Sequence, residues 1–188
     1  MNDGSLKTLF HPFDVAMLEA PGADARVLFL NAAPGFRLPE GFPASANLQQ
    51  DFGPAFRALE GGGHVPTPQP DCEDYDLVLV LLGRHRGQNE LWLAEGLKRA
   101  RMGGRIVVAG GKADGAASLH KRVAGLHPVD DHASKNHGIV FWLTRTEESS
   151  AAVEALEAAN PPLILDGGFL TVPGVFSQGH ADAGSTLL

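Results

Sequence analysis

The chain has 188 residues, of which 44% are hydrophobic and 20% charged, a balance that excludes a disordered chain and predicts one globular domain. Its formal net charge of -7 excludes the overall basic character of an independent nucleic-acid-binding domain. No apolar run approaches the ~18 residues of a membrane span and no signal peptide is visible, so we expect no membrane partner. A single cysteine, Cys72, excludes an internal disulfide and is typical of a cytoplasmic protein.

Four short apolar runs predict buried strands, at residues 25–30, 75–82, 105–109 and 138–143. They hardly alternate, which indicates burial on both faces, as in a parallel sheet covered by helices. A shorter strand or turn is expected near residues 47–52. Helices are predicted near residues 54–59, at 89–101 with Asn89 as N-cap, at 114–125 and at 150–159. A hairpin turning at residues 166–168 follows, so the pattern predicts a doubly wound, Rossmann-like, mostly parallel α/β sheet with a C-terminal hairpin.

Such a sheet binds nucleotides at the carboxyl ends of its strands. The first strand is followed by Asn31-Ala32-Ala33-Pro34-Gly35, which is not a glycine-rich phosphate loop, and Pro34 removes a backbone donor. We therefore expect no cofactor site in these residues. A small-molecule pocket there would have only Asn31, Arg84 and His85 as polar groups, and this remains an alternative reading.

Two clusters of polar residues can be explained either by a functional role or by an ordinary structural one. His127, His132 and His137, with two aspartates between them, lack the spacing of a zinc site, so we predict a polar loop and no metal. Six basic residues form a candidate RNA patch, although basic residues also complement the C-terminal end of a helix. They are Arg84, Arg86, Lys98, Arg99, Arg101 and Arg105.

The segment at 173–188, PGVFSQGHADAGSTLL, resembles the interdomain segment of the ribosomal RNA guanine-N2 methyltransferases, which belong to the methyltransferase small group. That family reads P-G-V-F-S, four variable residues, then D-x-G-S-x-L-L. The positions that match are Pro173, Gly174, Val175, Phe176, Ser177, Asp182, Gly184, Ser185, Leu187 and Leu188.

The resemblance implies that residues 1–160 are a degenerate class I methyltransferase-like domain, and that residues 161–188 are the hairpin and the segment leading to a catalytic domain. The catalytic motifs of the family, a D-x-G-x-G loop and N-P-P-F, do not occur, so the resemblance implies a fragment that is not active alone. The parent enzyme would transfer a methyl group from S-adenosylmethionine to guanine of ribosomal RNA. Phe176 would stack on a base or pack against the catalytic domain.

The resulting hypothesis is a non-catalytic N-terminal domain that supports its own C-terminal catalytic domain and helps to place ribosomal RNA. Two alternatives stay open. One is a stand-alone small-molecule-binding α/β domain, and the other is an interaction module that dimerises through the hairpin and tail.

Overall fold

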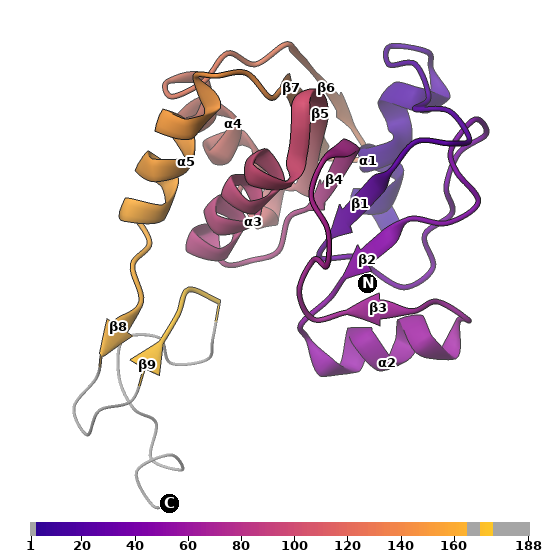
Figure 1. Cartoon of the computed structure of the whole chain (residues 1–188), viewed down its shortest axis with the longest axis horizontal. Helices are drawn as coiled ribbons and strands as arrows, with labels where there is room; N and C mark the ends of the chain where they lie inside the picture. The colour runs from indigo at the N-terminus through magenta and orange to yellow at the C-terminus, as the bar shows by residue number, and fades with distance from the viewer. Residues whose placement is uncertain (1–2, 165–169, 175–188) are drawn as a thin grey trace, which may run out of the picture.

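The protein is described by a computed structural model that covers residues 3–164 and 170–174. A seven-stranded sheet runs through it in the order β3-β2-β1-β4-β5-β7-β6 (Figure 1). Strands β1 to β5 pair in parallel, and β7 runs antiparallel between β5 and β6. The sheet confirms the predicted Rossmann-like class. Its strands are β1 (Val27–Leu30), β2 (Asn47–Gln49), β3 (Pro66–Thr67), β4 (Tyr75–Leu81), β5 (Ala100–Gly111), β6 (Asp131–Lys135) and β7 (Gly138–Thr144).

Helices cover the two faces of this sheet unequally, as Figure 1 shows. One face packs against α3 (Arg86–Arg99), α4 (Ala116–Ala124) and α5 (Ser149–Ala158). The other face packs against α1 (Asp3–Asp14) and a loop that contributes Phe36 and Phe42, with Leu59 of α2 (Gly53–Gly61) at its margin. A short 3-10 helix, η1 (Lys112–Asp114), links β5 to α4.

The absence of alternation in the central strands has the expected cause, because both of their faces are buried. In β4, Val78 and Val80 contribute to the α3 side of the core, whereas Leu77, Leu79 and Leu81 contribute to the α1 side. Each residue is at most 3% exposed. These strands hold the carboxyl ends of β1, β2 and β4 in fixed register along one edge of the domain.

Two of the elements that the sequence did not predict, α1 and β6, lack a strong apolar pattern. Helix α1 contains Pro12, yet Leu6, Leu9 and Phe10 form a helical stripe that is buried on the sheet. The expected polar loop around His132 is wrong for residues 131–135, which form the edge strand β6. A polar edge strand needs no apolar alternation, because solvent covers its outer side chains.

A pair of glycines, Gly103 and Gly104, lies within β5. The pairing of β4 with β5 shifts register here, and Gly103 has a φ of 75°. A Cβ at Gly104 would lie 2.8 Å from the carbonyl oxygens of both Arg101 and Tyr75. The two glycines therefore allow a β-bulge in one long strand rather than ending a loop.

The C-terminal hairpin is present as a separate two-stranded sheet of β8 (Leu163–Ile164) and β9 (Leu170–Thr171). In Figure 1 it follows α5 and projects away from the main sheet. Its predicted turn at residues 166–168 lies outside the described residues. The division into residues 1–160 and 161–188 stays a prediction.

Candidate functional site

The carboxyl ends of β1 and β2 are joined by three side-chain amides. Asn31, directly after β1, has a φ of 53° and donates from Nδ2 to the carbonyl of Leu81 at 2.7 Å. Its backbone N–H donates to Oε1 of Gln49 at 3.0 Å. Gln50 donates from Nε2 to Oδ1 of Asn31 at 3.2 Å and to the carbonyl of Ala32 at 2.8 Å. The strand ends are thus connected by neutral hydrogen bonds.

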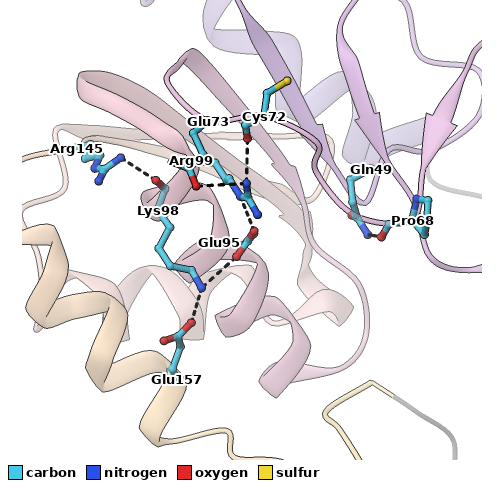
Figure 2. A network of polar contacts seen from close by, with 9 residues as sticks. All are labelled: Gln49, Pro68, Cys72, Glu73, Glu95, Lys98, Arg99, Arg145 and Glu157. Carbon is cyan, nitrogen blue, oxygen red and sulfur yellow. Dashed lines mark hydrogen bonds and ion pairs between the residues drawn. The ribbon is translucent and has the colours of Figure 1, made fainter.

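Burial makes the hydrogen bonds of this amide network costly to break. Gln49 and Gln50 are only 5% and 2% exposed, and an unpaired amide at that depth would cost free energy of folding. Gln49 also donates from Nε2 to the carbonyl of Pro68 at 3.1 Å, which ties β2 to the loop after β3 (Figure 2). Oε1 of Gln50 accepts from the backbone N–H of Phe52 at 2.9 Å. The polar groups that follow β1 and β2 are therefore largely bound to one another.

A fourth amide closes the end of β4. The prediction that Asn89 caps helix α3 is wrong, because α3 begins at Arg86 with His85 at the N-cap position. Asn89 instead lies buried in the first turns. Its Oδ1 accepts from the N–H of Gly83 at 2.8 Å, and its Nδ2 donates to the carbonyls of Gly83 and Asp114 at 2.8 and 3.0 Å. The side chain thus joins α3 to the loops after β4 and β5.

Sequence reasoning identified Asn31 but missed the roles of Gln49, Gln50 and Asn89. The signal in the sequence is the pair of consecutive glutamines at the carboxyl end of the short strand β2. Their partners are carbonyl groups far along the chain, and those could not be assigned without the fold.

Two cavities lie beside the amide network. The larger has a volume of about 680 Å³ and is lined by Asn31, Phe52, Arg84 and His85, among others. The smaller, of about 520 Å³, lies next to it and includes Leu91 and Arg99. Asp51, Gln88, Trp92, Val172 and Pro173 line both. The three polar groups proposed for a small-molecule pocket do meet here, at the ends of the strands.

The described part of the C-terminal segment, Pro173 and Gly174, closes one side of these cavities. A Cβ at Gly87 would lie 2.9 Å from Cβ of Pro173, and a Cβ at Gly174 would lie 2.5 Å from the side-chain amide of Gln88. Gly174 has a φ of 100°, a backbone conformation that residues with a side chain rarely adopt, so glycine is favoured at this position. The other predicted residues, Val175, Phe176, Ser177, Asp182, Gly184 and Ser185, lie outside the described residues.

A buried carboxylate anchors the approach to the hairpin. Glu90 of α3 is 2% exposed, and its Oε1 lies 3.1 Å from Nε of Arg86 and 3.0 Å from Nε of Arg122 on α4. Its Oε2 accepts from Nδ2 of Asn160, just beyond α5, at 2.7 Å. Glu90 therefore connects α3 with α4 and with the residues that follow α5.

The six basic residues of the candidate RNA patch are placed at opposite ends of α3. Arg84 and Arg86 lie at its N-terminal end, whereas Lys98 and Arg99 lie in its last turn, followed by Arg101 and Arg105 in β5. Twelve residues of helix separate Arg86 from Lys98, a distance of about 18 Å. The structure therefore forms two groups from the predicted set rather than one continuous patch.

The group at the C-terminal end of α3 is largely ion-paired, as Figure 2 shows. Lys98 lies 2.7 Å from Glu157 of α5 and 3.1 Å from Glu95. Arg99 lies 2.8 Å from Glu95 and 3.6 Å from Glu73, and it also donates to the carbonyl of Cys72. Burial raises the pKa of Glu95, but hydrogen bonds from Arg99 and Lys98 outweigh it and hold this pKa below its ordinary value.

The same pairing extends into β5. Nε of Arg101 lies 2.6 Å from Oδ1 of Asp76, and this hydrogen bond, with a second from the backbone N–H of Arg26, lowers the pKa of Asp76. Nε of Arg105 is buried and has no hydrogen-bond partner among the described residues. In contrast, Arg84 is exposed and makes no ion pair within residues 3–164 and 170–174.

The histidines of the discounted metal cluster are separated in the structure. His127 is 3% exposed, and its Nε2 lies 2.8 Å from Oγ of Ser149 at the start of α5. His132 lies on β6 with its ring 4.8 Å from that of His120, and His137 lies in the β6–β7 turn. Across the described ranges, no three histidine, cysteine or acidic side chains gather closely enough to hold a metal ion.

Two further observations concern partners. The hairpin exposes four apolar side chains, Leu163, Ile164, Leu170 and Val172, at 40%, 77%, 69% and 42%. Within the described part of the chain, no helix has the length and apolar character needed to cross a membrane.

Comparison with known sequences gives two informative matches, although no family model matches the chain. The chain is 35% identical over 125 residues to the ribosomal RNA small subunit methyltransferase C of Idiomarina loihiensis, a match that covers 63% of this chain and 37% of that protein. It is 29% identical over 116 residues to the protein of the same name from Vibrio vulnificus, covering 60% and 34%. The chain therefore spans little more than a third of these relatives.

Solved structures confirm the fold. A 16S rRNA N2 methyltransferase from T. thermophilus, in complex with AdoMet and guanosine, superposes with a TM-score of 0.62 at 23% identity, covering 86% of this chain and 46% of that one. A ribosomal protein L11 methylase from Lactobacillus delbrueckii subsp. bulgaricus gives a TM-score of 0.55 at 10% identity, covering 76% and 79%. The main sheet is thus that of class I methyltransferases.

Proposed function

We propose that this chain is the non-catalytic N-terminal domain of an S-adenosylmethionine-dependent ribosomal RNA guanine-N2 methyltransferase. Its role is to support the catalytic domain and to help place the RNA substrate. The sequence similarity to two ribosomal RNA methyltransferases and the class I methyltransferase fold support the family assignment. Because the chain spans just over a third of those relatives, the reaction is assigned to the remaining part of the enzyme.

The amide network is the observation that carries the non-catalytic role. A Rossmann-like site needs free backbone N–H groups and an open loop after β1. In this chain the N–H of Asn31 donates to Gln49, the N–H of Ala32 donates to the carbonyl of Gln49 at 3.0 Å, and Pro34 has no N–H. A cofactor bound in the usual way would have to break these buried bonds, each worth about 1 kcal/mol net and more if left unpaired.

Isothermal titration of S-adenosylmethionine into the 188-residue protein tests this assignment. We expect no heat of binding at about 100 μM protein, in the concentration range where a Kd of tens of micromolar is measurable. A class I methyltransferase of known cofactor affinity, titrated alongside, serves as the positive control. Saturable one-to-one binding would overturn the proposal and would favour a stand-alone enzyme or small-molecule binder.

The apolar hairpin supports the proposed partner. Exposed apolar groups of this kind mark protein contacts, and we propose that the catalytic domain covers Ile164 and Leu170. The test joins this chain to the region of the Idiomarina loihiensis relative that lies beyond the match, and follows methyl transfer from S-adenosylmethionine to 16S ribosomal RNA. Ile164→Asp is expected to lower the rate at least tenfold. Val65→Asp, at an 87% exposed apolar position directly before the edge strand β3, is the matched control.

A dimer of the chain is the alternative occupant of the same surface. Light scattering after gel filtration distinguishes the two at micromolar concentration. We expect a monomer, and a stable dimer that Ile164→Asp dissociates would replace the partner-domain proposal with the dimerising module.

A further inference from the structure

The two cavities at the carboxyl ends of the strands have no task in the support role proposed above. Their volumes of about 680 and 520 Å³ lie in the range of small-molecule sites, which is about 300–1,000 Å³. They share five lining residues, of which Gln88 and Trp92 lie on α3, and the smaller cavity extends along α3 to Glu95 and Arg99. We call this joint space the strand-end groove.

Aromatic side chains from two elements line the groove. Phe52, before α2, is 64% exposed, whereas most other phenylalanines contribute to the core. Its backbone N–H donates to Oε1 of the buried Gln50, so the amide network holds the backbone at this residue. Trp92 of α3 is half-buried, and a Cβ at Gly83 would lie 3.4 Å from its Cζ3, so no side chain covers the ring from that direction. Aromatic rings that line a groove in this way are suited to stacking with planar ligands.

Polar groups in the groove complement one nucleotide. Nδ2 of Asn31 donates one hydrogen to Leu81 and Oδ1 accepts one from Gln50, and each keeps a second position without a partner among the described residues. A side-chain amide with a donor and an acceptor pairs with the edge of adenine. The exposed guanidinium of Arg84 suits a phosphate, and the exposed carboxylate of Asp51 suits a ribose 2′-hydroxyl, which distinguishes RNA from DNA.

We propose that the strand-end groove binds an unpaired adenosine of single-stranded RNA. The base stacks on Phe52, the amide of Asn31 contacts its edge, and Arg84 contacts a flanking phosphate. This inference rests on the proposed RNA-placing function and adds to it a site and a nucleotide. It also accounts for the net charge of -7, because one stacked base and one arginine do not require a basic domain.

Tryptophan fluorescence tests the site directly. The two tryptophans differ in exposure, since Trp142 is 4% exposed in the core and Trp92 lines the groove, so a ligand in the groove quenches Trp92 selectively. Titration of hexa-adenylate RNA into the 188-residue protein is expected to give saturable quenching. Phe52→Ala should weaken binding about tenfold, since removing a stacked aromatic ring typically weakens binding roughly 5- to 150-fold per base. Arg84→Ala should weaken binding several-fold and reduce the salt dependence by about one phosphate contact.

Matched controls separate the groove from general effects of mutation. Val65→Ala removes an exposed apolar side chain outside the groove, and Lys121→Ala removes an exposed cation on α4, also outside it; both should bind as the parent does. Hexa-adenylate DNA should bind at least fivefold more weakly than the RNA.

Several outcomes would overturn the inference. One is that hexa-adenylate RNA does not quench the fluorescence at 1 mM. The others are that Phe52→Ala and Val65→Ala lose the same amount of binding affinity, and that DNA binds as tightly as RNA. If hexa-adenylate RNA does not quench the fluorescence and titration with S-adenosylmethionine also gives no heat of binding, the groove site is excluded but the support role stands. Tighter binding of free S-adenosylmethionine than of the RNA would instead remove both proposals.

Discussion

The two ends of helix α3 lie at opposite ends of the sheet and are stabilised by different chemistry. At the N-terminal end, buried neutral amides hold the strand ends, and the buried Glu90 lies beside Arg86 and Arg122. At the C-terminal end, partly exposed lysine, arginine and carboxylate side chains pair with each other (Figure 2). Neutral amides leave the nearby Arg84 without an ion pair among the described residues, whereas the other end neutralises most of its cations. A count of basic residues therefore says little about which of them face a ligand.

The largest expected effect is at Glu90. Glu90→Ala should lower the free energy of unfolding by about 3 kcal/mol, because it leaves Arg122 and Asn160 without their buried partner. Urea unfolding followed by circular dichroism measures this. Glu60→Ala, an exposed carboxylate on α2, is the control and should change stability by less than about 0.5 kcal/mol. Equal effects at the two positions would contradict the anchoring role of Glu90.

The amide network provides the next prediction. Asn31→Ala should cost about 2 kcal/mol, since it removes the bonds to Leu81 and Gln50 and places alanine at a positive φ. Asn136→Ala is a matched control, because Asn136 has a similar φ of 49° but is exposed in the β6–β7 turn. It should cost about 1 kcal/mol, from backbone strain alone. If the two variants unfold at the same urea concentration, the network contributes nothing measurable.

Acid should weaken the C-terminal end of α3 selectively. The pKa of Glu95 and that of Asp76 lie below their unfolded values, so their stabilisation is present above about pH 4.5 and is lost as the pH falls through the folded values. Between pH 5 and pH 3, Glu95→Gln should therefore lose less stability than the parent chain. Urea unfolding at several pH values gives both slopes, and parallel slopes would rule out this contribution of Glu95. The neutral amide network does not titrate in this range.

The smallest effect is expected for a single exposed pair. Lys98→Met should change the free energy of unfolding by less than about 1 kcal/mol, because Lys98 and Glu157 are 46% and 44% exposed and water screens their attraction. A double-mutant cycle with Glu157→Gln isolates their coupling. A coupling above 2 kcal/mol would mean that this end is held as firmly as the amide end.

A feature of the fold or the site could be predicted from the sequence when the residues that determine it are close together in the chain. The apolar runs of β4 and β7 and the glycine and proline signals around them were enough for the fold class. The strand β6 was not predictable from its residues, since its pairing depends on β7 and on a two-residue turn at Asn136 and His137, both with positive φ. At the site, Asn31 and Arg84 could be named from their positions after strands. Their partners, Leu81 and Gln50 for Asn31, are distant in sequence and required the sheet register.

The outer strands of the main sheet have a consequence for how the protein behaves when concentrated. One edge, β3, is two residues long and contains Pro66, which has no N–H to donate, and the other, β6, presents Asp131, His132 and Lys135. Short, proline-containing or charged edges resist the addition of a further strand from another chain. The seven-stranded sheet is therefore protected against edge-to-edge aggregation, and precipitation at high concentration would begin at the apolar hairpin of β8 and β9.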